Sequence, residues 1–274
     1  MNPDWIIPDW PAPAGVRAVM TTRAGGVSAA PYDSLNLGSH VGDAIIAVET
    51  NRRLLKSAIG TRAVFMDQVH GAAVLAINED SPDGQAADVS ITMRRRLACA
   101  VMVADCLPVL LTTQAGDAVA AVHAGWRGLA GTDKAAGQGV LESVFVSFKA
   151  LPHTGREQCA TKIIAWLGPC IGSDAFEVGA EVKAAFVAVQ PESARFFVQV
   201  GAAKYLANLP ALARLRLRAL GVYEFYGNDG TASWCTVSNP SRFFSHRRDA
   251  GVADSAGTGF GSTGRMAACI WIDA

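Results

Sequence analysis

The sequence predicts a single α/β (α+β) domain with a mixed β-sheet flanked by helices. Apolar runs of strand-like composition alternate with segments of helical periodicity along the whole chain, which is typical of sheets covered by helices. Several runs are too continuously apolar for a sheet with one face in water, so we expect both faces to be covered. No linker-like segment divides the 274 residues, and we expect one domain over residues 1–274.

The first half of the chain is predicted to hold most of the strands. Residues 16–22 are expected to form a strand that leads into a turn-rich segment. Helical spacing of apolar residues predicts a helix over residues 51–59, which Gly60 would end. Strands are expected to dominate residues 64–122, and helical periodicity continues over residues 126–149.

The second half continues the alternation. A strand is expected over residues 163–167, and a helix over residues 174–189 with Ser173 or Asp174 as its N-cap. Residues 204–220 include an alternating Arg-Leu stretch that also fits a strand, but their length and their Ala and Leu content favour a helix.

Gly221 would end that helix, and its arginines are expected to form a solvent-exposed face. Further strands are predicted over residues 222–226, 233–237 and 266–272.

Composition narrows the class of protein. Half of the residues are hydrophobic, the formal net charge is +0 and the pI is about 6.9. This balance disfavours a protein that neutralises nucleic-acid phosphates, so a small-molecule substrate is expected. The N-terminus lacks a basic segment before an apolar core, and no apolar segment reaches the roughly 18 residues of a membrane span. We therefore expect a cytoplasmic protein with no membrane partner; its oligomeric state is left open, and a monomer is compatible with the sequence.

The six cysteines are too sparse for a disulfide scaffold, and no two form a C-x-x-C pair. We expect them to be reduced and mostly buried among apolar residues. Cys106 is the exception, because it is a candidate functional residue and not an apolar core residue.

Three apolar segments each run to one potential metal ligand, followed by a glycine or proline. The ligands are His70, Cys106 and His123. Strands that end side by side in one sheet would bring the two imidazoles and the thiolate together at its rim. Three N/S ligands with a vacant fourth position are the composition of a catalytic zinc site. The alternative is two histidines bonded to backbone and a core thiol.

Acidic and basic residues flank these ligands. Asp67 and Asp105 are candidates to accept the second N–H of a ligating imidazole, or equally to cap the turns after the strands. Gly125 and Arg127, at the start of the helix expected after His123, are candidates to bind an anion. Trp126 is expected to pack in the core.

A G-x-G-x-x-G pattern occurs at residues 259–264, without the preceding strand or the following acidic residue of a dinucleotide-binding site. We interpret it as a flexible loop.

Residues 67–71, 104–108 and 122–128 closely resemble the signatures of the YfiH-type laccase-domain family, known both as multicopper polyphenol oxidases and as purine nucleoside phosphorylases. Further segments that resemble the family are residues 34–38, 51–52, 168–172, 176–179, 243–249 and 263–267. The similarity covers nearly the whole chain. It departs at residues 250–262, where the family has only a few residues.

The resemblance implies a fold related to that of bacterial deamidating toxins that use a Cys/His pair, a cysteine-hydrolase-like fold. It implies zinc on His70, Cys106 and His123, which would be the catalytic residues. It also implies phosphorolysis of adenosine, inosine, guanosine and methylthioadenosine to the base and ribose 1-phosphate, with adenosine deaminase activity. The partners would be purine nucleosides and phosphate.

Asn36 and Arg52 match positions that line the family's pocket. Within the three signatures, the candidate substrate-binding residues are Gln68, Asp105, Gly125 and Arg127. An anion site near Arg52 or Arg127 could hold phosphate below the anomeric carbon. Zinc could orient that phosphate, or activate a water for deamination.

Three alternatives stay open. Five histidines are too few for the copper set of a polyphenol oxidase, although copper binds such ligands more tightly than zinc. A metal-free Cys106–His123 hydrolase that edits a peptidoglycan precursor is a second reading. The third is a non-catalytic binding module.

Overall fold

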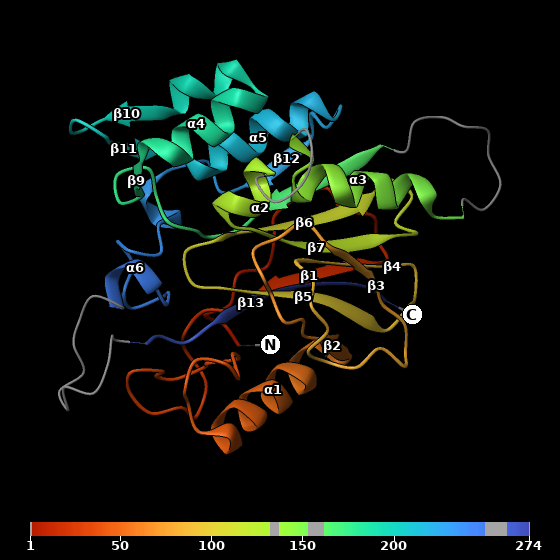
Figure 1. Ribbon diagram of the computed structural model, residues 1–274. Coiled ribbons are helices and arrows are strands. Elements are labelled where there is room, and N and C mark those ends of the chain that lie inside the picture. The colour runs from red at the N-terminus through yellow and green to blue at the C-terminus, as the bar shows by residue number, and fades with distance from the viewer. Residues whose placement is uncertain (1, 132–136, 153–161, 250–261, 274) are drawn as a thin grey trace.

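The longest apolar runs of the chain form the central strands of two stacked β-sheets (Figure 1). These strands are buried at every residue, as expected where both faces of a sheet are covered. They are β5 (Leu97–Val103), β6 (Leu107–Thr113), β7 (Val119–Ala124) and β13 (Met266–Ile272). The structure is a computed structural model that describes residues 2–131, 137–152, 162–249 and 262–273.

The first sheet has the strand order β1-β13-β5-β2, with β1 (Val16–Met20) and β2 (Arg62–Val64) at its edges. β2 pairs with β5 in parallel, and the other pairings are antiparallel. Helix α1 (Ile45–Ile59) covers the outer face of this sheet (Figure 1). Leu55 and Ile59 of the helix belong to the core cluster on that face.

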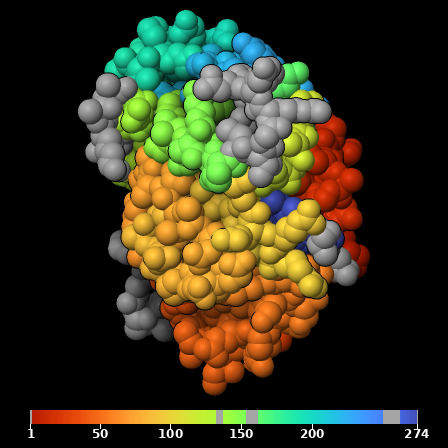
Figure 2. Space-filling view, turned by 90° about the vertical axis from the view of Figure 1, so that its right-hand side faces the viewer, coloured from red at the N-terminus to blue at the C-terminus, as the bar shows by residue number. Residues whose placement is uncertain are grey.

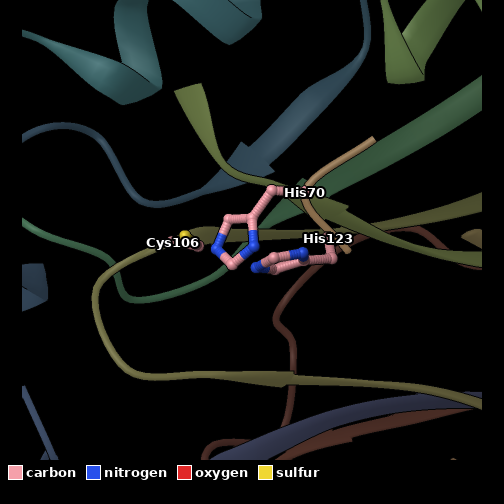
Figure 3. A group of neighbouring side chains, drawn as sticks. All are labelled: His70, Cys106 and His123. Carbon is pink, nitrogen blue, oxygen red and sulfur yellow. The ribbon is translucent and has the colours of Figure 1, made fainter. Parts of the chain in front are cut away.

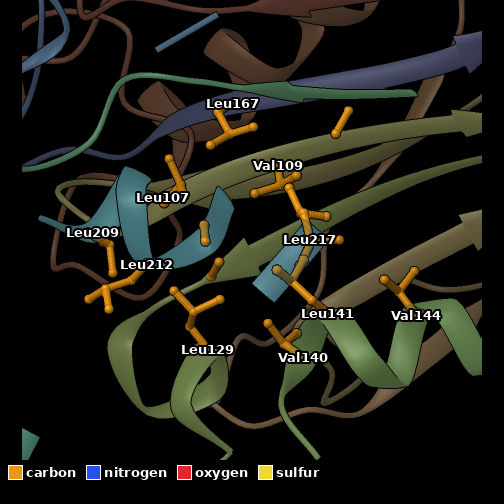
Figure 4. Packing of buried hydrophobic residues seen from close by; sticks show 14 of the residues in the cluster. Leu107, Val109, Leu129, Val140, Leu141, Val144, Leu167, Leu209, Leu212 and Leu217 are labelled. Atoms are coloured by element: carbon orange, nitrogen blue, oxygen red, sulfur yellow. The ribbon is translucent and has the colours of Figure 1, made fainter. Parts of the chain in front are cut away.

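The second sheet has the order β12-β8-β6-β7-β4-β3 and is also mixed, because β12 and β3 pair in parallel with their neighbours. Its remaining strands are β3 (Val74–Ala76), β4 (Val89–Thr92), β8 (Ile163–Leu167) and β12 (Phe225–Gly227). The helices on its outer face are α2 (Trp126–Ala130), α3 (Val140–Ala150), α4 (Ala180–Val189) and α5 (Leu209–Ala219). Figure 4 shows leucines and valines of α2, α3 and α5 packed against β6 and β8.

The described residues thus form four layers: helix, sheet, sheet and helices. Figure 2 shows the same stacking on one flank, with teal and green residues of the helical layer above, orange and yellow residues in the middle and the deep orange region of α1 below. A small antiparallel sheet stands beside the helical layer, in the order β10-β11-β9. Its strands are β9 (Glu177–Gly179), β10 (Phe197–Gln199) and β11 (Lys204–Ala207). Three short helices complete the described elements: η2 (Pro191–Phe196), η3 (Ala232–Trp234) and α6 (His246–Asp249).

The predicted α/β fold with mixed strands flanked by helices is confirmed, with the strands divided among these sheets. The strands over residues 163–167 and 266–272 are confirmed with their bounds, and the strand over residues 16–22 ends at Met20. α1 begins six residues before the predicted residue 51. The helix predicted over residues 126–149 is two helices, α2 and α3.

Two predicted helices contain a strand in their first part. Residues 177–179 and 204–207 pair with each other as β9 and β11, so the helices α4 and α5 start later than predicted. Ser173 and Asp174 are therefore wrong as N-caps: Gly179 is at that position in α4. In α5 the N-cap is Asn208, whose side chain accepts the backbone N–H of Ala211 at 3.0 Å.

The last strand predictions are partly wrong. The strand predicted over residues 222–226 is shifted to β12 (Phe225–Gly227). Residues 233–237 form the end of η3 and a single bridge between Cys170 and Cys235. The side chain of Asn239 donates to the carbonyls of Ala232 and Cys235, which replaces the ladder bonds of a strand.

The cysteines follow the prediction where they are described: Cys106 is half-buried, and the buried ones are Cys99, Cys170, Cys235 and Cys269. Cys159, residues 250–261 of the predicted loop and the first part of the G-x-G-x-x-G pattern lie outside the described residues. No helix in the described ranges combines the length and apolar character needed to cross a membrane.

Arg216 contradicts the prediction of a fully exposed arginine face on α5. Its side chain is 3% exposed, and its guanidinium lies 2.9 Å from Glu142 of α3. The same guanidinium donates to the carbonyl of Gly137 at 2.6 Å. Arg218 is exposed, as predicted. The arginine stretch therefore ties α5 to α3 through one buried ion pair.

Replacing Arg216 with methionine is expected to lower the free energy of unfolding by about 3 kcal/mol, because Glu142 would lose its partner in a largely buried position. Arg218→Met is the matched control on the same helix. Arg218 stacks on the ring of Phe225 at 5.0 Å and its loss should cost less than about 1 kcal/mol. Urea unfolding of both variants measures the difference, and equal midpoints would contradict the structural role of the ion pair.

Candidate metal centre and cavity

His70, Cys106 and His123 converge at one end of the β6–β7 hairpin (Figure 3). One ligand atom from each of the three lies within 4.8 Å of the other two. The two imidazole rings are 4.8 Å apart at 74°, an edge-to-face arrangement. His70 is exposed, Cys106 is half-buried and His123 is buried.

The route by which they converge differs from the predicted one. Only His123 lies inside a strand, near the end of β7. Cys106 lies in the turn between β5 and β6, which belong to different sheets. His70 lies in the loop after β2 with a positive φ of 58°, so it does not end a strand. The prediction of three strand ends in one sheet is therefore wrong.

Gln68 fixes the loop that carries His70. Its side-chain amide donates to the carbonyl of Met102 at 2.8 Å and accepts the backbone N–H of Met102 at 2.7 Å. Both ends of the Gln68 amide are thus bonded to the end of β5, which holds the loop against the first sheet.

Asp88 holds two of the candidate ligands at once. One oxygen of its fully buried carboxylate accepts the backbone N–H of His70 at 2.9 Å and Nδ1–H of His123 at 2.7 Å. Its other oxygen accepts the backbone N–H of Gly71 at 2.7 Å. With Nδ1 of His123 bonded in this way, the Nε2 lone pair is the one left for a metal.

Asp88 therefore has the role that we predicted for Asp67 or Asp105. The carboxylate of Asp105 instead accepts the Thr236 hydroxyl and the backbone N–H of Arg247. Sequence reasoning missed Asp88. The one sequence feature that could have indicated Asp88 is its position directly before the fully buried strand β4.

Gly125 leaves the space that the three side chains occupy. A Cβ atom at Gly125 would lie 3.0 Å from Cδ2 of His70 and 3.2 Å from Sγ of Cys106. The glycine is thus required for close approach of the ligands, a different reason from the predicted contact with an anion.

The charges of Cys106 and His123 are coupled. Burial alone would raise the pKa of the Cys106 thiol, but the charge of His123 and hydrogen bonds from both histidines lower it to about 6. Burial alone would lower the pKa of His123, but the Cys106 thiolate and Asp88 raise it to about 9. Without a metal, the pair is a thiolate and an imidazolium at neutral pH.

These residues fit a metal ion. A thiolate and two imidazoles, one of them oriented by a buried carboxylate, are ligands that bind zinc and also copper. In the part of the chain that the structure describes, this is the single group of three or more His, Cys, Asp or Glu residues close enough to share an ion.

Zinc binding is expected to release about one proton at pH 7.5, because His123 must lose its proton to coordinate while Cys106 has already lost its own. The apparent zinc affinity should therefore rise about tenfold per pH unit from pH 6 to pH 9 and level off above. Titration calorimetry of zinc-stripped protein in buffers of different ionisation enthalpy measures the released protons. A zinc affinity that stays constant between pH 6 and pH 8 would contradict the ion pair.

A cavity of about 410 Å³ borders the three ligands, a size that accommodates a small organic ligand. Four of the five histidines of the chain line it. One wall is mainly apolar and carries residues of the helical side of the molecule: Trp126, Ile171, Phe176 and Leu209. Polar residues at the cavity also include His40, Gln68, Asp105, His246, Arg247 and Arg265.

Of the predicted substrate-binding residues, Gln68 and Asp105 line this cavity and Gly125 lies against the three ligands. Asn36 is fully buried: its amide donates to Gly38 and Asp43 and accepts from the backbone of Arg265.

Neither Arg52 nor Arg127 is among the lining residues. The Arg52 guanidinium bonds to the carbonyl of Leu37 and to Asp83. Arg127 stacks on Trp126 at 4.6 Å and lines a separate hollow of about 190 Å³ beside Gly71.

The cationic side chains at the cavity are therefore ones that the site prediction did not include, among them Arg247 and Arg265. The signal that could have found them is their place in the segments 243–249 and 263–267, which resemble the family. Trp126, predicted to pack in the core, is half-buried and also lines the cavity.

The chain is similar to known proteins over nearly its whole length. Residues 17–273 match the family described as multi-copper polyphenol oxidoreductase laccase. Purine nucleoside phosphorylase YfiH of Escherichia coli is 45% identical over 269 residues, which cover 97% of this chain and 98% of that protein. A purine nucleoside phosphorylase of Pseudomonas aeruginosa is 44% identical over 269 residues, 98% of each chain.

Two crystal structures share the fold. A Neisseria meningitidis protein is 43% identical with a TM-score of 0.80, covering 99% of this chain and 100% of that chain. YlmD from Geobacillus stearothermophilus is 30% identical with a TM-score of 0.79, covering 95% of this chain and 93% of that chain.

Proposed function

The chain belongs to the multi-copper polyphenol oxidoreductase laccase family that includes the YfiH proteins, and we propose that it is a zinc-dependent purine nucleoside phosphorylase. Its substrates would be phosphate and adenosine, inosine, guanosine or methylthioadenosine, with adenosine deamination as a second activity, in the cytoplasm. The observation that carries the proposal is the group of three N/S ligands at a cavity with an apolar wall and cationic side chains.

The reaction that this site would perform breaks one bond and forms one. A phosphate oxygen bonds to C1′ of the ribose as the bond from C1′ to the purine nitrogen breaks, and the purine leaves with the bonding electrons and takes up a proton. Positive charge develops on the ribose and negative charge on the base, so holding phosphate and nucleoside in line provides much of the rate gain.

The residues have separate roles in this proposal. His70, Cys106 and His123 would hold zinc, which supplies Lewis acidity beside the substrate when bound. Asp88, which accepts Nδ1–H of His123, would leave Nε2 of that ring free to bind the ion. The apolar wall with Trp126 and Phe176 would receive the flat base and exclude water from one side of it.

The test is to incubate zinc-loaded protein with each nucleoside, with and without phosphate, and to identify the products by chromatography. Free base and ribose 1-phosphate that form only with phosphate support the proposal, and their absence for all four nucleosides would refute it. Inosine formed from adenosine without phosphate tests the deaminase activity separately. Arg94→Gln is the control variant. Arg94 is exposed, and its guanidinium lies 3.9 Å from the carboxylate of Glu79, so this variant should keep wild-type activity.

A second candidate is a Cys106–His123 hydrolase, for example one that edits a peptidoglycan precursor. The observation that favours it is the thiolate–imidazolium pair with Asp88 on the far ring nitrogen, an order of groups that also activates cysteine nucleophiles. Amide hydrolysis by metal-depleted protein, blocked by alkylation of Cys106, would support it. A polyphenol oxidase with several coppers would need more than one group of metal ligands, and the described residues contain a single group.

A further inference from the structure

We propose that Arg265, with His40, binds the phosphate co-substrate at the side of the cavity that is formed by the first sheet and its loops. This inference rests on the proposed phosphorylase function and assigns one of its two substrates to named side chains. Both residues line the cavity that borders the three metal-ligand candidates.

The backbone of Arg265 is fixed from both sides. Its N–H donates to the side-chain oxygen of Asn36 at 2.9 Å, and its carbonyl accepts the N–H of Leu37 at 3.0 Å. Arg265 also directly precedes β13, a strand buried at every residue. The guanidinium is therefore presented from a rigid part of the first sheet.

The side chain of Arg265 is held as well. Its Nη1 donates to the carbonyls of Thr263 at 2.9 Å and Gly264 at 3.2 Å. Its stem lies over Gly38, where an added Cβ would come within 2.7 Å of Cγ of Arg265. These contacts fix one edge of the guanidinium, and a planar guanidinium has a second edge with which to grip an oxyanion.

The charge of Arg265 has no close counter-ion among the described residues. The ion pairs within 4.0 Å in those residues include other arginines, such as Arg52 with Asp83 and Arg248 with Asp249, but not Arg265. Burial lowers the pKa of Arg265, although the charges of Cys106 and Asp105 act in the opposite direction, so the guanidinium is held in a poorly solvated position. A bound anion would offset the cost of that desolvation.

His40 adds a second donor. Partial burial and then the charge of Arg265 lower the pKa of His40, so its imidazole is neutral at pH 7 and offers one N–H without adding charge. An arginine fork beside a neutral N–H donor matches a tetrahedral oxyanion better than it matches a neutral sugar or base.

Arg247, the other arginine at the cavity, already has hydrogen-bond partners for its guanidinium. The Arg247 guanidinium donates to the carbonyls of Ala175 at 3.3 Å and Glu177 at 3.0 Å, and it lies 5.8 Å from the ring of Phe176. Arg247 thus belongs with the apolar wall. In the described residues, the guanidinium of Arg265 donates through Nη1 alone, so its remaining N–H groups are the ones left to bind phosphate, while the base would lie against the apolar wall.

The test measures binding of inorganic phosphate to the zinc-loaded protein by calorimetry, without nucleoside. Arg265→Gln is expected to weaken phosphate binding by about 30-fold, the range of one charge-assisted hydrogen-bond pair, and Arg265→Lys by less because the charge remains. His40→Gln should weaken phosphate binding by about fivefold. Arg94→Gln is the matched control and should bind phosphate as the wild type does.

Steady-state kinetics give a second readout. The KM for phosphate of Arg265→Gln should rise by about the same factor, while the KM for the nucleoside changes less than about threefold. Phosphate affinity within threefold of wild type in Arg265→Gln overturns the inference, and so does loss of zinc from that variant. A loss of phosphate binding in Arg52→Gln or Arg127→Gln, with Arg265→Gln intact, also overturns it.

Failure of the phosphorylase proposal looks different in these experiments. In that case, wild-type protein binds phosphate through Arg265 and yet releases no base, and the anion site stands without the reaction. Wild-type protein that shows no phosphate binding at all removes the anion site itself.

Discussion

Replacing Cys106 with alanine is expected to remove tightly bound zinc and to lower phosphorolysis by more than about 1,000-fold, which corresponds to about 4 kcal/mol of transition-state stabilisation. Cys106 supplies the single sulfur ligand of the candidate site, and its thiolate also stabilises the charge of His123. Without it, two imidazoles remain, which is too few for a stable catalytic zinc site. Elemental analysis and the phosphorolysis assay measure the two losses on the same preparation.

Cys99→Ala is the matched control for this thiol deletion. Cys99 is fully buried between the sheets, and burial raises its pKa to about 12, so it is never a thiolate at working pH. That variant should lose some stability, by about 1 kcal/mol, and keep its zinc and turnover. Stoichiometric zinc and turnover within tenfold of wild type in Cys106→Ala would show that the three-residue site is not the catalytic metal centre.

The candidate ligands could be named from the sequence, but not the way in which they meet. His70, Cys106 and His123 were predicted as one group because each follows an apolar run and precedes a chain-bending residue, features that are local. Their convergence depends on contacts that are not local: Gln68 with the end of β5, and Asp88 with the His70 loop. Periodicity carries no information about such side-chain to backbone bonds.

The same limit explains the misplaced arginines. Arg216 alternates with leucine in the sequence and looks like part of a polar face, yet Glu142 on another helix makes its burial favourable. Arg52 and Arg127 lie within family-like segments, but Arg52 pairs with Asp83 and Arg127 stacks on Trp126, and neither arginine lines the cavity. Arg265 reaches the cavity because β13, which follows it, pairs with β5. The two strands are far apart in the sequence, so local patterns do not predict this contact.

Replacing Asp88 should have the second large effect, because one carboxylate supports both histidines. Asp88→Asn is expected to weaken zinc binding by about 10- to 100-fold, the usual cost of losing the partner of a ligating imidazole. Asp88→Ala should also lower the free energy of unfolding by about 3 kcal/mol or more, since the N–H groups of His70 and Gly71 and Nδ1–H of His123 would lose their acceptor.

A purely structural role for Asp88 would change stability alone, so the decisive readout is the proton balance of zinc binding. The carboxylate helps to raise the pKa of His123. In Asp88→Asn the pKa of His123 should fall, and zinc binding at pH 7.5 should release less than the one proton expected for the wild type. Asp117→Asn, at the far end of the β6–β7 hairpin where Asp117 bonds to Thr113, is the matched control and should change neither zinc affinity nor proton release. Wild-type zinc affinity and proton release in Asp88→Asn would mean that His123 is oriented by the fold of β7 itself, and that the buried carboxylate serves only to anchor the His70 loop.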